Sequence, residues 1–102
     1  MRIEFARSGG FAGILLTARV DLQDLPPAEA AVLQAQVEAA GFFELPAQLR
    51  PASTTPDRFE YQLTVVAADK THTVTVSEPM VTDVLRPLLD HLTALARTGK
   101  YR

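Results

Sequence analysis

The 102-residue sequence contains no cysteine and only two histidines, His72 and His91. Without cysteine, the chain cannot form a disulfide, use a thiolate as a nucleophile or bind a metal through sulfur. Two histidines cannot build a standard zinc site by themselves, and the sequence has neither an HExxH motif nor another paired spacing of His with a carboxylate. We therefore predict that the chain holds no metal and no cofactor, and that each histidine packs in the core or at its rim.

Long apolar runs and an excess of one charge are missing as well. No stretch approaches the roughly 20 apolar residues of a membrane span, and the N-terminal MRIEFAR alternates like a strand, unlike the apolar run of a signal peptide. The ten basic and twelve acidic residues are scattered and give a formal charge of −2, whereas nucleic-acid binding normally needs clustered cations. We expect a soluble, cytoplasmic protein that binds neither membranes nor nucleic acid.

Familiar catalytic motifs are also missing. Ser8 precedes two glycines, but a nucleophile elbow needs the pattern GxSxG between a strand and a helix. The same SGG lacks the lysine and the following helix of a phosphate-binding loop. Asp83 and Asp90 lie seven residues apart on the polar side of a predicted helix, where solvation of the surface explains them better than acid–base pairing. The sequence therefore predicts a protein that is not an enzyme.

The composition is that of an ordinary globular protein, with 47% hydrophobic and 22% charged residues. A chain of 102 residues has room for one core, so we predict a single domain over residues 1–102. A monomer is favoured, and the sequence leaves the oligomeric state open.

Two segments near the N-terminus alternate between apolar and polar residues, which is the period of a strand with one buried side. Ile3 and Phe5 share a face in the first segment. After the glycines, one face of the second segment carries Ile14, Leu16, Ala18 and Val20. The two segments predict a β-hairpin. Leu15 departs from the alternation and is predicted to be an exposed apolar residue.

The period changes to that of a helix in the stretch DLPPAEAAVLQAQVEAAG. Pro26 and Pro27 suit a first helical turn. An apolar stripe follows at helical spacing and consists of Ala30, Leu33, Val37 and Ala40. Gly41 suits a left-handed helix end, over which Phe42 can close. Residues 44–57 contain three prolines and show no sustained period, so they predict a surface loop.

The second half of the chain repeats this order. Alternation over residues 59–65 and again over residues 73–77 predicts a second hairpin. Residues 80–97 predict a second amphipathic helix, whose apolar stripe consists of Val81, Val84, Leu85, Leu88, Leu92 and Leu95. Pro87 within this stretch predicts either a kink or a short helical turn before the main helix.

The element order is therefore strand, strand, helix, strand, strand, helix (ββαββα). This order favours an α+β fold: a two-layer sandwich with a four-stranded antiparallel sheet and both helices on one face. The opposite sheet face is predicted to carry Arg2, Glu4, Thr17, Arg19, Glu60, Gln62, Thr64, Thr73 and Thr75. A solvated surface is the simpler interpretation of this polar face, and a recognition surface is the alternative.

Five stretches of the chain together resemble a known family: RIEFARSGGFAG, EAAGFFELP, DRFEYQLTV, HTVTVSE and LRPLLDHL. In this order and spacing they are similar to the emfourin family, small bacterial protein inhibitors of protealysin-type metallopeptidases. The resemblance runs over nearly the whole chain. It implies a stoichiometric inhibitor of thermolysin-like zinc proteases, with a protealysin-like metallopeptidase as the partner. The zinc would belong to the protease, and a cytoplasmic location would fit protection of the producing cell.

The first hairpin turn is the leading candidate for contact with such a protease. Gly9 and Gly10 allow a narrow projecting tip, and Phe11 either folds back over the sheet or stands out from it. We predict that Ser8, Gly9, Gly10 and Phe11 enter the substrate cleft as a rigid loop, because an ordered loop gains affinity and resists cleavage. The resemblance implies that the target prefers a large apolar residue beside the scissile bond, which Phe11 would supply.

One hairpin tip does not supply the roughly 800 Å² per partner of a standard interface. A second loop is therefore expected, either residues 49–57 or the turn at Asp69 and Lys70, and the sequence does not rank the two. The alternative function is a non-enzymatic regulatory or accessory module that binds through the exposed sheet face or a dimer interface. Exposure of Leu15 and Val66 on that face would support this alternative.

Overall fold

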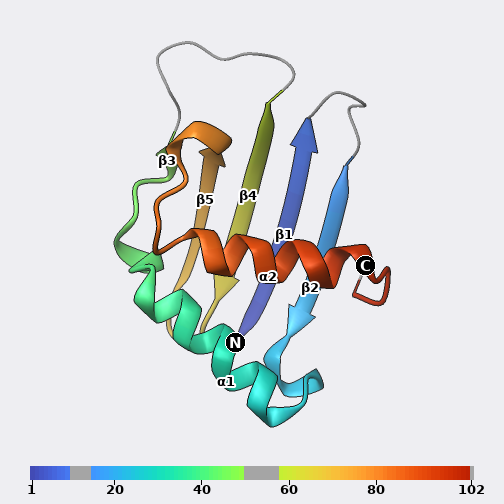
Figure 1. The fold of residues 1–102 in the computed structure, drawn as a ribbon. Helices are drawn as coiled ribbons and strands as arrows, with labels where there is room; N and C mark the ends of the chain where they lie inside the picture. Colours follow the sequence, from blue (N-terminus) through green and yellow to red (C-terminus); the bar gives the residue numbers. More distant parts are fainter. Residues whose placement is uncertain (10–14, 50–57, 102) are drawn as a thin grey trace.

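The computed structural model describes residues 1–9, 15–49 and 58–101. Over these residues the fold is α+β, with one mixed sheet of five strands in the order β2-β1-β4-β5-β3 (Figure 1). β1 (Arg2–Gly9) pairs antiparallel with β2 (Leu16–Asp21) on one side and with β4 (Phe59–Val66) on the other. β4 also pairs antiparallel with β5 (Thr71–Ser77). The two predicted antiparallel strand pairs are confirmed.

The expectation of four antiparallel strands is wrong, because a fifth strand, β3 (Gln48–Leu49), pairs parallel to β5. β3 lies in the stretch that was predicted to be only a loop. Its pairing is made by the backbone, and the Thr75 N–H also donates to the Ala47 carbonyl at 2.8 Å. Two residues are too few to show an alternating pattern, so no periodic signal in the sequence predicts this strand.

The first helix forms as predicted. α1 (Pro27–Ala39) has Pro26 at its N-cap and buries Leu33 and Val37. Gly41 follows with φ of 60°, the left-handed conformation that a glycine adopts easily at a helix end. Phe42 then enters the core with 1% of its surface exposed, in the short 3-10 helix η2 (Phe42–Glu44).

The second helix is shorter than predicted. α2 spans Arg86–Arg97, with Pro87 in its first turn, where a missing N–H costs no helical hydrogen bond. A separate 3-10 turn, η3 (Glu78–Met80), precedes it, which is the second of the two outcomes that Pro87 predicted. Val84 falls in the segment between η3 and α2 and is 53% exposed, so its predicted place on the buried stripe is wrong.

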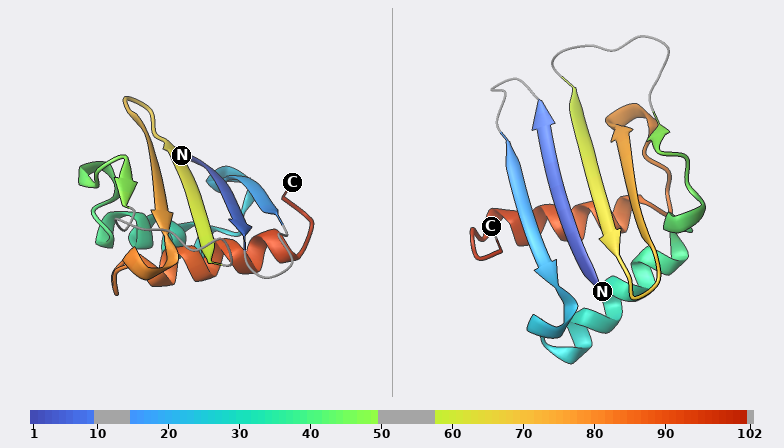
Figure 2. Two further views of the ribbon diagram at one scale, coloured as in Figure 1. Left: turned by 90° about the horizontal axis from the view of Figure 1, so that it is seen from above. Right: turned by 180° about the vertical axis from the view of Figure 1, so that it is seen from behind.

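The two helices occupy different positions relative to the sheet. α2 crosses one face of the sheet, whereas α1 runs past the strand ends near the N-terminus (Figures 1 and 2). His91 of α2 hydrogen-bonds to two α1 side chains, with Nδ1 2.9 Å from Gln36 Oε1 and Nε2 3.2 Å from Glu29 Oε1. The expected layer of two helices over one face is not confirmed, because the place of α1 is beside α2 at the end of the sheet.

Alternation along the strands divides the sheet into a core face and a polar face, as predicted. The core face, covered by α2, buries Ile3, Phe5, Ala18, Val20, Tyr61, Leu63, Val65, Val74 and Val76. His72 lies on the same side, with Nε2 2.7 Å from the Leu45 carbonyl oxygen and its ring 5.5 Å from that of Phe42. Packing of both histidines at the core or its rim is confirmed.

Candidate functional site

The two ends of the sheet carry different parts of the chain. The loop end is the end at which β1 and β5 finish and β4 begins; its outermost rows pair Gly9 with Phe59, and Ser8 with Glu60, which in turn pairs with Ser77. The turn end carries the β4–β5 turn, residues 67–70, in which the Ala67 N–H donates to the Lys70 carbonyl at 2.8 Å. Eight residues of β4 separate the two ends by about 25 Å.

The predicted contact residues Ser8 and Gly9 are the last two residues of β1, at the loop end. Gly10 and Phe11, the other two, lie outside the described residues. Gly9 has φ of 92°, and a Cβ atom built on it would overlap the carbonyl oxygen of Arg58. Two backbones therefore approach each other closely at this point, which only glycine permits.

Arg7 and Phe59 stack on each other just inside the loop end. The guanidinium carbon of Arg7 lies 4.3 Å from the centre of the Phe59 ring, which is a cation–π geometry. The Arg7 Nε atom is buried and has no hydrogen-bond partner among the described residues. The stack joins β1 to β4 directly beneath Ser8 and Gly9, and it restrains the base of the predicted contact.

The register of β4 and β5 separates the two candidates for a second contact loop. Leu49 ends β3 and pairs with Val76 of β5, one residue before the loop-end row, so β3 ends near the loop end; residues 50–57 lie outside the described residues. Asp69 and Lys70 belong to the opposite, turn end. Of the two predicted contact segments, Leu49 is thus on the same end of the sheet as Ser8, and the Asp69–Lys70 turn is on the opposite end.

A hydrogen-bonded cluster ties η3, α2 and β4 together behind the loop end. Arg86 donates from Nη1 and Nη2 to the two carboxylate oxygens of Glu78, at 3.2 Å each. This pairing raises the pKa of the Arg86 guanidinium above its usual range. Burial raises the pKa of the nearby Tyr61 hydroxyl, and the Glu78 carboxylate raises it further. The phenol therefore stays neutral between a fixed cation and a fixed anion.

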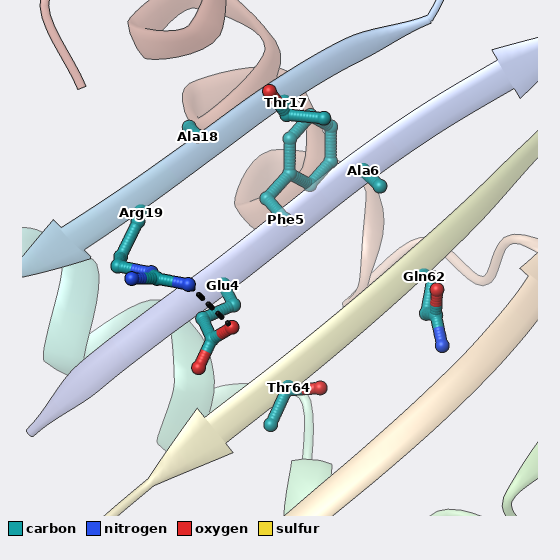
Figure 3. A pocket seen from close by; sticks show the side chains of 8 residues that line it. All are labelled: Glu4, Phe5, Ala6, Thr17, Ala18, Arg19, Gln62 and Thr64. Carbon is teal, nitrogen blue, oxygen red and sulfur yellow. Dashed lines mark ion pairs between the residues drawn. The ribbon is translucent and has the colours of Figure 1, made fainter. Parts of the chain in front are cut away.

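The polar face carries a shallow hollow of about 490 Å³ between β2, β1 and β4 (Figure 3). Glu4 lies at its floor and pairs with two arginines, 3.5 Å from Arg2 and 3.6 Å from Arg19. Thr64 on its wall hydrogen-bonds across to Thr73 at 2.8 Å. Among the residues that line the hollow, the Glu4 carboxylate is offset by the Arg19 guanidinium. Leu15, beside the loop end, is 61% exposed, as predicted, whereas Val66, at the turn end of β4, is partly buried.

Within residues 1–9, 15–49 and 58–101, no group of three His, Asp or Glu side chains is placed to hold a metal ion. None of the helices in these ranges is both long enough and apolar enough to cross a membrane.

Comparison with protein families identifies the chain. The model of the Emfourin family matches residues 5–93, nearly the whole sequence. The chain belongs to the Emfourin family. Searches of curated proteins and of solved structures returned no significant match. The matched range of this Emfourin chain contains all four predicted contact residues, Ser8 to Phe11, and also both Glu78 and Arg86.

Two features of this Emfourin chain were missed by sequence reasoning. Arg7 has the same strand parity as Ile3 and Phe5, so the alternation could have placed it on the core face. Pro79 and Pro87 bracket a short segment whose ends meet through Glu78 and Arg86, and the two prolines were the available signal for it. Neither signal alone shows which side chains are exposed.

Proposed function

We propose that this protein is an inhibitor of protealysin-like, thermolysin-type zinc metallopeptidases, and that it blocks the substrate cleft with rigid loops. The observation that carries the proposal is the Emfourin family match over residues 5–93, because that family points to a metallopeptidase inhibitor. The inhibitor itself needs no metal, since the zinc ion belongs to the protease.

The loop end supplies the contact in this proposal, with Ser8, Gly9, Gly10 and Phe11 entering the cleft. β1 is hydrogen-bonded on both sides, to β2 and to β4, so the strand that carries Ser8 and Gly9 cannot shift without breaking two ladders. The close approach of Gly9 to Arg58 and the Arg7–Phe59 stack add local restraint. Such preorganisation lowers the entropy lost on binding and hinders cleavage of the bound segment.

Inhibition is the direct test. The purified protein is titrated against a protealysin-like protease and, in parallel, against thermolysin, while peptide hydrolysis is followed. Stoichiometric loss of protealysin activity is the expected result. A folded protein that leaves the protealysin-like enzyme fully active would overturn the proposal.

Substitution of Phe11 tests the hairpin contact separately. Phe11→Ala is expected to weaken inhibition at least about tenfold, the effect of truncating a central interface aromatic. Phe43→Ala is the control, because Phe43 is a partly buried phenylalanine that lies near the turn end, with Lys70 Nζ 4.5 Å from its ring centre. Unchanged inhibition by a folded Phe11→Ala variant would exclude the hairpin tip as the contact.

A regulatory or accessory module that binds through the polar sheet face is the second candidate. The hollow over Glu4, Thr17 and Arg19, together with exposed Leu15 nearby, is the observation that favours it. Thr17→Arg and Arg19→Glu would disturb this face and leave the loop-end residues in place. Loss of partner binding in these variants, with protease inhibition absent, would favour the module over the inhibitor.

A further inference from the structure

An inhibitor contact centred on Ser8 and Gly9 needs a neighbouring surface, because a hairpin tip alone falls short of roughly 800 Å². The sheet register identifies the neighbours. Ser8 pairs with Glu60 and Glu60 pairs with Ser77, so Ser77 lies two strands away, about 10 Å along the same row. Residue 78 begins η3 immediately after this row. The segment 78–86 therefore starts at the loop end.

The segment 78–86 is held closed at its base. The two-pronged Arg86–Glu78 pair joins its first residue to its last, as described above. Inside it, the Val81 N–H donates to the Glu78 carbonyl at 3.2 Å, and the Leu85 N–H donates to the Thr82 carbonyl at 3.1 Å. Leu85 is 2% exposed and anchors the segment in the core. Its shape is thus fixed by contacts within the chain.

This closed segment presents apolar side chains to solvent. Met80 is 39% exposed and Val84 is 53% exposed, although Leu85 of the same segment is buried. The two residues are four positions apart, so their Cα atoms lie within about 14 Å. Of the large apolar side chains among the described residues, the exposed ones are these two, Leu15 beside Ser8, and Val32 on α1. Three of these four therefore belong to the loop end or to the segment that leaves it.

We infer that segment 78–86 is the second contact of the inhibitor, and that Met80 and Val84 pack against an apolar rim of the metallopeptidase cleft. This inference rests on the proposed function. The area requirement and the continuity with Ser8 favour this occupant over a small ligand, and the fixed base means that little order is lost when the apolar side chains are covered. Exposed apolar side chains on a rigid support are what a protein interface buries.

Three substitutions test the segment against a protealysin-like protease. Val84→Thr keeps the shape of the side chain and replaces one methyl group by a hydroxyl, and Met80→Gln similarly keeps the length. Val32→Thr is the matched control, since Val32 is 51% exposed and lies on α1, away from the loop end. Inhibition constants are measured for the wild type and all three variants, and urea unfolding confirms that each is folded.

The expected result is a loss of affinity of at least about fivefold for Val84→Thr or Met80→Gln, with Val32→Thr within about twofold of the wild type. If the wild type inhibits and both segment variants match Val32→Thr, segment 78–86 is not a contact, while the proposed function stands. If the folded wild type does not inhibit at all, both the proposed function and this inference are wrong.

Discussion

The two ends of the sheet differ in how completely their side chains are packed and hydrogen-bonded within the chain. At the turn end, Phe42 is buried between Phe43 and His72, the His72 ring hydrogen-bonds to the Leu45 carbonyl, and Lys70 covers the Phe43 ring. Each apolar or polar group named there has a partner within the chain. α1 closes the same end of the molecule (Figure 1).

The loop end leaves more surface without an internal partner. Leu15 and Met80 are exposed, and the buried Nε of Arg7 has no hydrogen-bond partner among the described residues. Buried polar atoms and large exposed apolar side chains both cost stability when nothing covers them. The contrast teaches that local rules of burial and pairing are followed at the turn end and broken at the loop end, which is the pattern that the proposed contact at the loop end would explain.

The substitution expected to change stability most is Phe42→Ala at the turn end. Phe42 is 1% exposed, so its truncation removes a buried ring and leaves a cavity. The free energy of unfolding should fall by about 3–5 kcal/mol, measured by urea denaturation. Inhibition per folded molecule should not change, because the substitution lies at the far end of the sheet. A large loss of inhibition by the variant, measured without urea under conditions in which it is fully folded, would show that the two ends are coupled.

Gly9 at the loop end and Gly41 near the turn end form a matched pair, and substituting each by alanine is expected to lower the free energy of unfolding by a smaller amount. Gly9→Ala places a Cβ against the Arg58 carbonyl at φ of 92°, and we expect a cost of about 3 kcal/mol from strain. Gly41→Ala meets only the Glu44 side chain, 3.8 Å away, at φ of 60°, and should cost about 1 kcal/mol.

Inhibition assays on the same glycine pair sharpen the comparison. Gly9→Ala should also weaken inhibition because it moves the backbone beside Ser8, whereas Gly41→Ala should leave inhibition unchanged. Equal destabilisation in the two variants would mean that the close approach at Gly9 is relieved by a small shift of the chain. Equal inhibition would mean that this shift does not reach the contact.

Local sequence signals predicted the elements that are long and regular. The helical spacing of Leu33 and Val37, with Gly41 at the end, predicted α1, and strict alternation predicted β1, β2, β4 and β5. β3 was missed because its two residues hold their place through the backbone of β5 and leave no pattern in the sequence. The start of α2 was placed too early because Val81 and Val84 continue the helical stripe before Pro87, although the chain there follows η3 and an irregular segment.

The candidate site was predictable only in part for the same reason. A glycine pair beside a strand predicted a turn, and Ser8 and Gly9 do lie at a strand end. That Leu49 and the Asp69–Lys70 turn lie at opposite ends of the sheet could be seen only from the register of the strands. Exposure of Met80 and Val84 depends on which side of the η3–α2 segment faces the core, and the irregular backbone between η3 and α2 leaves no periodic pattern that would predict it.

The smallest expected effect is a pH dependence of the free energy of unfolding that comes from Tyr61, near the loop end. The loop end has Tyr61 buried beside Glu78 and Arg86, with its pKa raised above the ordinary value near 10. As the pH rises past about 10, the unfolded chain therefore loses its phenol proton before the folded chain does, and stability contributed by neutral Tyr61 is lost. The free energy of unfolding should fall with a slope no steeper than about 1.4 kcal/mol per pH unit, the limit for one proton. Tyr61→Phe should remove this part of the slope, so urea unfolding of both proteins between pH 9 and about 11.5 measures it as a difference. Parallel curves would mean that the surroundings of Tyr61 do not raise the pKa of its phenol in the folded chain.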